Sequence, residues 1–127
     1  MKEAIRHIDL ESEFYTPEGC YIIELSNTAG DEEASIARAR VEPGVTTRWH
    51  RLSGTTERYV ILEGNGCVEV GGLTPQDVCA GDVVIIPQSC RQRISNVGVG
   101  DLIFLAICTP RFRQELYEDI EGRVVQP

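Results

Sequence analysis

Short β-prone runs that alternate with glycine turns constrain the fold of this chain more than any other feature of its sequence. The runs are rich in Val, Ile and Tyr, and turns such as Pro43-Gly44, Ser53-Gly54 and Gly71-Gly72 separate them. Repeats of about 8–12 residues are typical of strands in sandwiches and barrels. The pattern predicts strands over residues 21–25, 34–42, 45–52, 57–62, 67–70, 83–87, 91–96 and 102–108. The sequence therefore predicts an all-β sandwich or barrel.

Two segments carry more specific structural predictions. Gly64-Asn65-Gly66 is typical of a tight hairpin, so residues 67–70 are expected to pair back on residues 57–62. Residues 111–120 (RFRQELYEDI) place Phe112, Leu116, Tyr117 and Ile120 along one side of a helix. A short C-terminal helix is therefore expected.

Length and charge restrict the class of protein. The 127 residues suit a single domain, 1–127, with a buried core. The chain has 20 acidic and 12 basic residues, a net charge of −8, which makes nucleic acid a poor partner. No apolar run of about 18 residues is present to span a membrane. The polar first residues indicate no signal peptide, and a cytoplasmic location is expected.

The five cysteines predict neither disulfides nor a thiolate zinc site. Their number is odd, their spacings are wide, and no Cys-x-x-Cys occurs. We expect most of them to be reduced and partly buried as small apolar residues.

Residues 45–62 bring together a histidine and a carboxylate. If these strands are adjacent and antiparallel, His50 and Glu57 point into one cavity. Alternation places Arg48 on the His50 face, where it would bind a substrate carboxylate or phosphate, or form a surface salt bridge. Tyr59 shares the Glu57 face and is either a ligand contact or a core tyrosine.

Residues 34–42 also alternate, and their two faces differ. Small side chains share one face, which would leave open space in a barrel: Ser35, Ala37, Ala39 and Val41. Arg38 and Arg40 share the other face. They would either line a pocket for an anion or be solvated.

Two gapped motifs resemble those of a known family. Gly44, His50, Leu52, Glu57 and Gly64 match the spacing of the first cupin motif, G-x5-H-x-H-x4-E-x6-G, over residues 44–64. The second motif, G-x5-P-x-G-x2-H-x3-N, is matched over residues 81–96 by Gly81, Pro87, Ser89, Gln92 and Asn96. The chain also resembles small single-domain cupins of the mannose-6-phosphate-isomerase-like branch.

The cupin resemblance implies a jelly-roll β-barrel (a double-stranded β-helix) with its site inside the barrel, usually in a homodimer. Cupins usually hold one divalent metal with three histidines and a glutamate. Here only His50 and Glu57 are retained, while Leu52 and Gln92 occupy the other two positions. The implied ligands are therefore His50, Glu57 and Gln92, around zinc, iron, manganese or nickel. The alternative is that these three side chains hydrogen-bond one another without a metal.

Two functions are compatible with a site that retains two of the four motif ligands. One is a metal-dependent isomerase, lyase or dioxygenase acting on a small sugar-like or carboxylate molecule, with Glu57 as the catalytic candidate. The other is a metal-free module that binds or senses a small molecule without turning it over.

Overall fold

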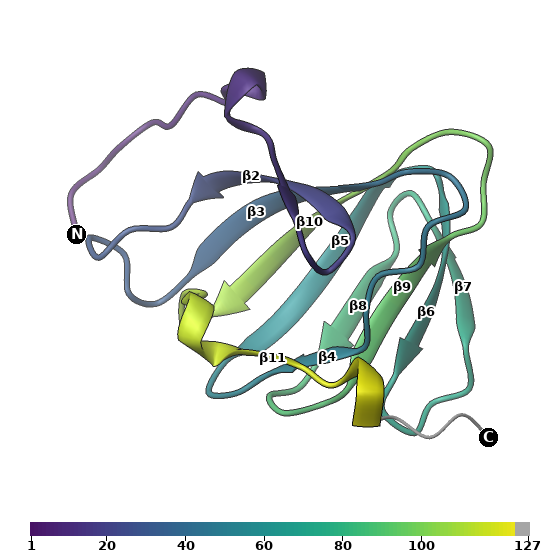
Figure 1. Ribbon diagram of the computed structural model, residues 1–127. Helices are drawn as coiled ribbons and strands as arrows, with labels where there is room; N and C mark the ends of the chain where they lie inside the picture. Colours follow the sequence, from purple (N-terminus) through teal and green to yellow (C-terminus); the bar gives the residue numbers. More distant parts are fainter. Residues whose placement is uncertain (124–127) are drawn as a thin grey trace.

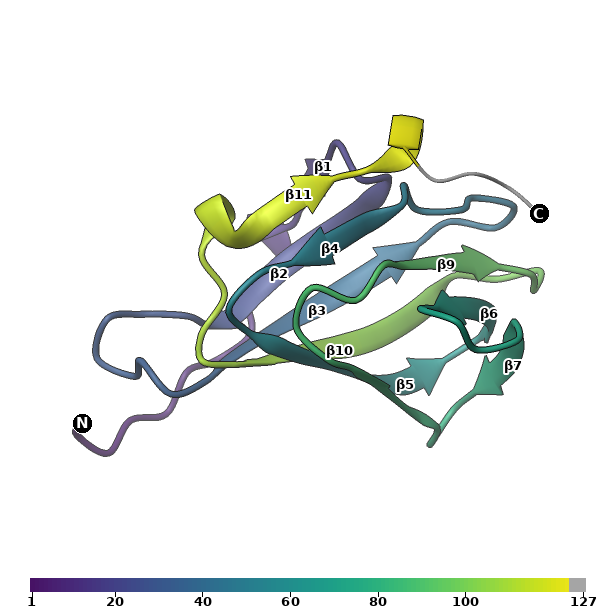
Figure 2. The same cartoon turned by 90° about the horizontal axis from the view of Figure 1, so that it is seen from below.

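The computed structural model describes residues 1–123 and folds them into two antiparallel sheets that face each other (Figure 1). The six-stranded sheet has the order β1 (Phe14–Thr16), β2 (Cys20–Ser26), β3 (Ser35–Val41), β10 (Leu102–Thr109), β5 (Thr56–Glu63) and β8 (Val83–Ile86). The five-stranded sheet has the order β11 (Tyr117–Asp119), β4 (His50–Leu52), β9 (Gln92–Asn96), β6 (Asn65–Val70) and β7 (Gln76–Cys79). Figure 2 shows β11 and β4 lying over β2 and β3. The predicted all-β jelly roll is confirmed.

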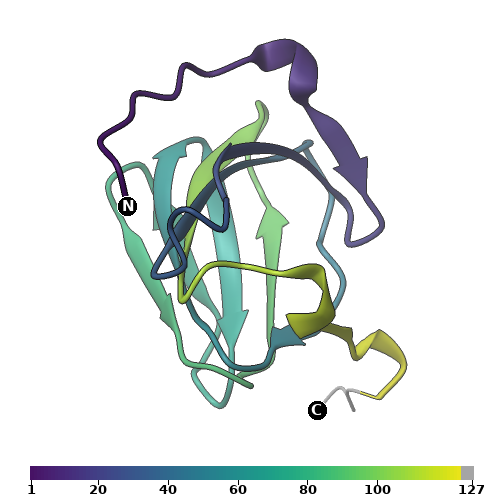
Figure 3. The same cartoon turned by 90° about the vertical axis from the view of Figure 1, so that its left-hand side faces the viewer.

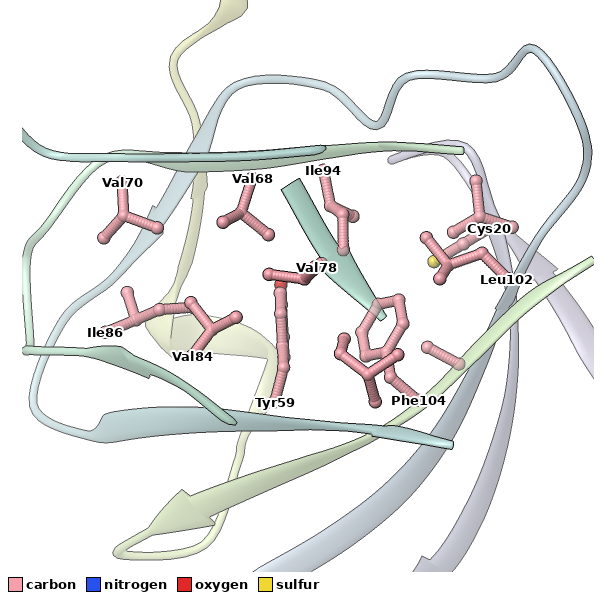
Figure 4. Close-up of a cluster of buried hydrophobic side chains, with 13 residues drawn as sticks. Cys20, Tyr59, Val68, Val70, Val78, Val84, Ile86, Ile94, Leu102 and Phe104 are labelled. Carbon is pink, nitrogen blue, oxygen red and sulfur yellow. The ribbon is translucent and has the colours of Figure 1, made fainter. Parts of the chain in front are cut away.

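The core lies between the two sheets and follows the alternation of each strand. In β9 every second residue is buried, and the buried face includes Ile94. Side chains from both sheets meet there (Figure 4), among them Tyr59, Val68, Val70, Val84, Ile86 and Phe104. Because side chains in a strand alternate between faces, the opposite faces point away from the core, as Arg93 does on β9 and Val83 and Ile85 do on β8.

The expected hairpin at Gly64-Asn65-Gly66 is wrong. β5 pairs with β10 and β8, whereas β6 pairs with β7 and β9, so Gly64 carries the chain from one sheet to the other. Gly64 has a φ of +88°, and a Cβ atom there would lie 2.6 Å from the Asp101 carbonyl oxygen. Only glycine fits this crossing without strain.

The expected C-terminal helix is not formed either. The segment contains a 3₁₀ turn, η2 (Gln114–Leu116), then β11, then a second 3₁₀ turn, η3 (Glu121–Arg123). Tyr117–Asp119 pair instead with β4, whose edge would otherwise leave its backbone groups without partners. In Figure 3 the C-terminal segment crosses the end of the barrel between the two sheets.

The N-terminal residues contribute little to this body. Residues 1–9 are exposed, and Ile5 and Ile8 do not pack on the domain, with exposed fractions of 85% and 53%. A third 3₁₀ turn, η1 (Leu10–Ser12), leads into β1. Within residues 1–123, no helix has the length and apolar character needed to cross a membrane.

Candidate functional site

His50, Glu57 and Gln92 all point into the space between the sheets. His50 on β4 and Gln92 on β9 are paired residues of the five-stranded sheet, while Glu57 lies on β5 of the six-stranded sheet. The expected placement of His50 and Glu57 on adjacent strands is therefore wrong, because they face each other from opposite sheets. All three side chains are buried, with exposed fractions of 3%, 9% and 1%.

A chain of hydrogen bonds crosses the interior through Gln92. The Tyr59 hydroxyl donates to Gln92 Oε1 at 2.6 Å, and Gln92 Nε2 donates to Glu57 Oε1 at 2.9 Å. The second carboxylate oxygen, Glu57 Oε2, lies 3.8 Å from Cys108 Sγ. Because an ionised carboxylate only accepts, its contact with the amide fixes which end of Gln92 faces Glu57. The network holds Glu57 in one orientation.

The carboxyl group of Glu57 has an unusual affinity for its proton. Burial raises the pKa of Glu57 to about 6, and the nearby Glu18 carboxylate adds to the rise. His50 and the Gln92 hydrogen bond act in the opposite direction but only partly offset burial. A carboxyl group with such a pKa exchanges protons readily near neutral pH.

The His50 ring is oriented by three neighbours. Its Nδ1 lies 2.8 Å from the Arg48 carbonyl oxygen, so Nδ1 carries a proton, since a carbonyl can only accept. Its Nε2 lies 3.5 Å from Glu18 Oε2. The ring stacks on Tyr117, with centroids 5.2 Å apart and planes inclined by 23°. Nε2 is therefore the atom that can exchange a proton with a ligand or with Glu18.

Glu18 is a site residue that the sequence pattern does not reveal. It lies in the Pro17-Glu18-Gly19 turn between β1 and β2, and nothing in the local pattern distinguishes it from a solvated loop carboxylate. Only the fold of that turn over the barrel end brings it to His50.

Beside these groups the barrel contains a cavity of about 530 Å³, which Glu57 lines. A smaller neighbouring space of about 50 Å³ is lined by Glu57, His50 and Tyr59. Small residues make the larger space possible, because Ser35 and Ala37 of β3 line it together with Ala106 of β10. The open space predicted beside the small face of residues 34–42 is present next to Ser35 and Ala37, whereas Ala39 and Val41 pack in the core.

The predicted arginine sites lie outside the cavity. The strand containing His50 begins only at that residue, so alternation does not carry Arg48 inward. Arg48 is exposed and pairs with Asp119 at 2.6 Å. Arg38 and Arg40 lie on the outer face of β3 and both pair with Glu13. Of the alternatives for these arginines, the structure shows outward-facing ion pairs.

The ligand set that the resemblance implied for a metal does not fit these residues as they lie. The oxygen of Gln92 already accepts from Tyr59, and its amino group faces Glu57. Leu52, at the position of the second motif histidine, is buried and has no donor atom. Within residues 1–123, no three His, Cys, Asp or Glu side chains are grouped as metal ligands. Of the alternative cluster, the structure shows the hydrogen bond between Gln92 and Glu57, whereas the His50 ring contacts the Arg48 carbonyl oxygen and Glu18.

Comparison with known proteins supports the fold and the family. The chain is 31% identical over 110 residues to the uncharacterized protein MJ1618 of Methanocaldococcus jannaschii, covering 85% of this chain and 87% of that protein. A Thermotoga maritima protein described as a predicted oxalate decarboxylase (tm1287) shares 30% identity, with a TM-score of 0.66 over 72% of this chain and 80% of its own. The Streptomyces nucleoside dehydratase Pac13 has a TM-score of 0.74 at 15% identity, over 93% and 92% of the two chains.

A family model described as "Cupin domain" matches residues 37–108, which contain both motifs and every strand from β4 to β9. Strand order, the glycine crossing at Gly64 and the inward-facing motif residues all agree with this match. The chain belongs to the cupin family.

Proposed function

We propose that this cupin is an enzyme that transfers protons on a small molecule, in a lyase or isomerase reaction, with Glu57 and His50 as the acid–base groups. The observation that carries the proposal is the buried Glu57 carboxyl, which lines a 530 Å³ cavity and has a pKa raised to about 6. A general base or acid works best when its pKa lies near the operating pH. Carboxyl groups that line a cavity and have shifted pKa values are typical of functional sites.

The two groups supply proton transfer from opposite sides of the interior. Glu57 projects from β5 and His50 from β4, and Glu57 lines both spaces, so a molecule that extends from the larger cavity into the smaller one would meet a carboxylate on one side and an imidazole on the other. The ionised Glu57 would take a proton, and the imidazolium form of His50, with a proton on Nε2 as well as on Nδ1, would return one to another atom of the same molecule. Gln92 and Tyr59 keep the carboxylate aimed, as a positioning pair.

Proton transfer by Glu57 and His50 requires no rearrangement of the side chains in the site. Metal binding by His50, Glu57 and Gln92 would require the Gln92 oxygen to leave the Tyr59 hydroxyl, which would then lose its acceptor inside the barrel. A proton-exchange experiment can distinguish the proposed reaction from the metal-dependent function and from ligand sensing without a reaction.

The relatives narrow the chemistry only slightly. The description of the Thermotoga protein suggests a small dicarboxylate substrate for that protein. In this chain such a dianion would meet Glu18, Glu24 and Glu57. These carboxylates would repel oxalate from the cavity.

Proton exchange with solvent gives a direct test, because it detects a reaction whatever its product is. The metal-stripped protein is incubated in D₂O with a panel of small amino, hydroxy and oxo compounds, and NMR follows deuterium incorporation, water loss or isomerisation. We expect at least one compound to react, and Glu57→Gln to slow that reaction by about 10²–10⁴-fold. Glu63→Gln, an exposed position on the same strand, is the matched control and should react at the wild-type rate.

Three outcomes would overturn the proposal. An unchanged rate in Glu57→Gln would remove the carboxyl from the chemistry. Activity that returns only with an added divalent metal would favour the metal-dependent function. Compounds that bind to the cavity, as seen by chemical-shift changes, without any reacting would favour the binding module.

A further inference from the structure

The lining of the 530 Å³ cavity offers negative charge without positive charge. Three glutamates line it, Glu18 from the β1–β2 turn, Glu24 from β2 and Glu57 from β5. Among the described residues, no arginine or lysine lines this space or the smaller one beside it. The cavity is therefore a region of negative potential within the barrel.

Two of these glutamates have no cation to balance them. Within residues 1–123, Glu24 and Glu57 form no salt bridge, whereas Glu18 faces His50. Glu24 follows Ile22 on the inner face of β2, and its carboxyl is open to the cavity solvent. Burial among neighbouring atoms nevertheless raises the pKa of Glu24, as it does for Glu57. Both carboxylates would be stabilised by a positive charge placed between them.

Aromatic rings from two separate parts of the chain complete the lining. Phe14 and Tyr15 come from β1, and Phe112 and Tyr117 come from the C-terminal segment that crosses the barrel end. The face of an aromatic ring carries negative partial charge and attracts ammonium groups within about 6 Å. Rings and carboxylates thus favour the same kind of ligand.

We propose that this cavity binds a small organic cation, with its ammonium group held between the glutamates and the aromatic rings. An anion would be repelled by all three carboxylates, and a neutral molecule would gain only apolar burial and hydrogen bonds. The volume of about 530 Å³ accommodates a molecule of metabolite size. The inference deepens the proposed function, on which it rests for identifying this cavity as the substrate site, and names the substrate class.

Matched probes isolate the charge of the ligand. Choline is compared with 3,3-dimethyl-1-butanol, which has the same shape without the charge, and butylamine is compared with 1-butanol. Oxalate serves as the anionic probe. Binding is measured by calorimetry and by the shift in thermal unfolding. We expect at least one cation to bind ten or more times more tightly than its neutral counterpart, and oxalate not to bind, because charge sets the preference.

Variants assign the binding to this cavity. Glu24→Gln removes one carboxylate that no described ion pair uses, and should weaken cation binding about tenfold without changing the affinity for the neutral probe. Phe112→Leu removes a ring face at similar size and should weaken choline more than its neutral counterpart. Glu63→Gln, exposed on β5, should change neither affinity.

Equal affinity for charged and neutral partners, tighter binding of oxalate, or no binding of any probe at about 10 mM would each overturn the inference. Cation binding that Glu24→Gln leaves unchanged would overturn it as well. The readout is binding alone, so cation binding without any Glu57-dependent reaction would leave this inference standing and refute the proposed function. A Glu57-dependent reaction on neutral compounds only would support the proposed function and refute the inference of a cationic ligand.

Discussion

At the scale of a single residue, Glu57 is both buried and ionisable, and burial disfavours its charged form. It is buried between the sheets, and the groups around it only partly compensate its charge. Gln92 donates one hydrogen bond to it, but no described arginine or lysine approaches it. Such a carboxylate costs stability when ionised, and proteins commonly keep groups of this kind at functional sites.

This cost predicts how stability changes with pH. The pKa of Glu57 is raised from 4.5 to about 6, so the folded protein holds this proton more tightly than the unfolded chain does. The protonated Glu57 therefore adds fully to the free energy of unfolding below about pH 4.5, and this stabilisation is lost as the pH rises through about 6. Relative to Glu57→Gln, the wild type should lose on the order of 2 kcal/mol of unfolding free energy between these limits and pH 7.

Urea unfolding of both proteins at several pH values between about 4.5 and 7.5 measures the difference. The other titrating groups are shared by the two proteins, so their effects cancel in the comparison. Glu63→Gln should run parallel to the wild type. A Glu57→Gln curve that is also parallel would show that the pKa of Glu57 is not raised in the folded protein.

At the scale of strands, pairing between distant segments of the chain decides which structure forms. Strands β5 and β6 are consecutive, but they belong to different sheets, and Gly64 makes the connection. The C-terminal segment adds β11 to the edge of β4, where Arg51 pairs with Glu118 at 2.9 Å. Local patterns suggested a hairpin and a helix at these two places, and pairing with distant strands replaced both.

Gly64→Ala should be strongly destabilising. The new Cβ would lie 2.6 Å from the Asp101 carbonyl oxygen, which belongs to backbone and cannot easily move, and φ is +88°. We expect the free energy of unfolding to fall by more than about 2 kcal/mol. Chemical denaturation measures the change.

Gly72→Ala is the matched control, because a Cβ there meets nothing within 4 Å and no positive φ applies. It should stay within about 0.5 kcal/mol of the wild type. Equal stability of the two variants would contradict the crossing geometry at Gly64.

Charge is separated between outside and inside at the scale of the whole molecule. The arginines that form ion pairs, such as Arg38, Arg40 and Arg93, face outward, whereas the charged side chains that line the cavity are all glutamates among the described residues. With a net charge of −8, the protein as a whole also favours cations over anions near its surface. Global charge and cavity charge therefore act in the same direction.

The folded body should tolerate loss of the first residues. Residues 1–8 are exposed, and a hydrogen bond of 3.4 Å from Arg6 to Thr28 is what ties them to the domain. Deleting residues 1–8 should change the unfolding free energy by less than about 0.5 kcal/mol, since little surface is buried there. Thermal and urea unfolding provide the measurement.

Deleting residues 1–16 is the comparison, because it also removes β1 and Glu13, the partner of Arg38 and Arg40. That deletion should be clearly destabilising. If the shorter deletion destabilised the protein in a concentration-dependent way, residues 1–8 would instead contact a second copy. The homodimer expected from the family resemblance remains a prediction that the same experiment addresses.

Local sequence patterns were enough to predict most of the strands, the family and the three inward-facing motif residues. Alternation and motif spacing are local properties, and His50, Glu57 and Gln92 can be placed from them. The small residues of 34–42 likewise predicted an open space, which the structure has beside Ser35 and Ala37, whereas Ala39 packs in the core.

What these residues do together follows from the three-dimensional fold alone. Which sheet each strand joins, that Tyr59 takes the Gln92 oxygen, and that Glu18 reaches His50 all depend on contacts between distant segments. The same holds for the grouping of Glu24 with Glu57 around a cavity that lacks arginine and lysine among the described residues. Packing of two sheets sets these distances, and no local pattern records them.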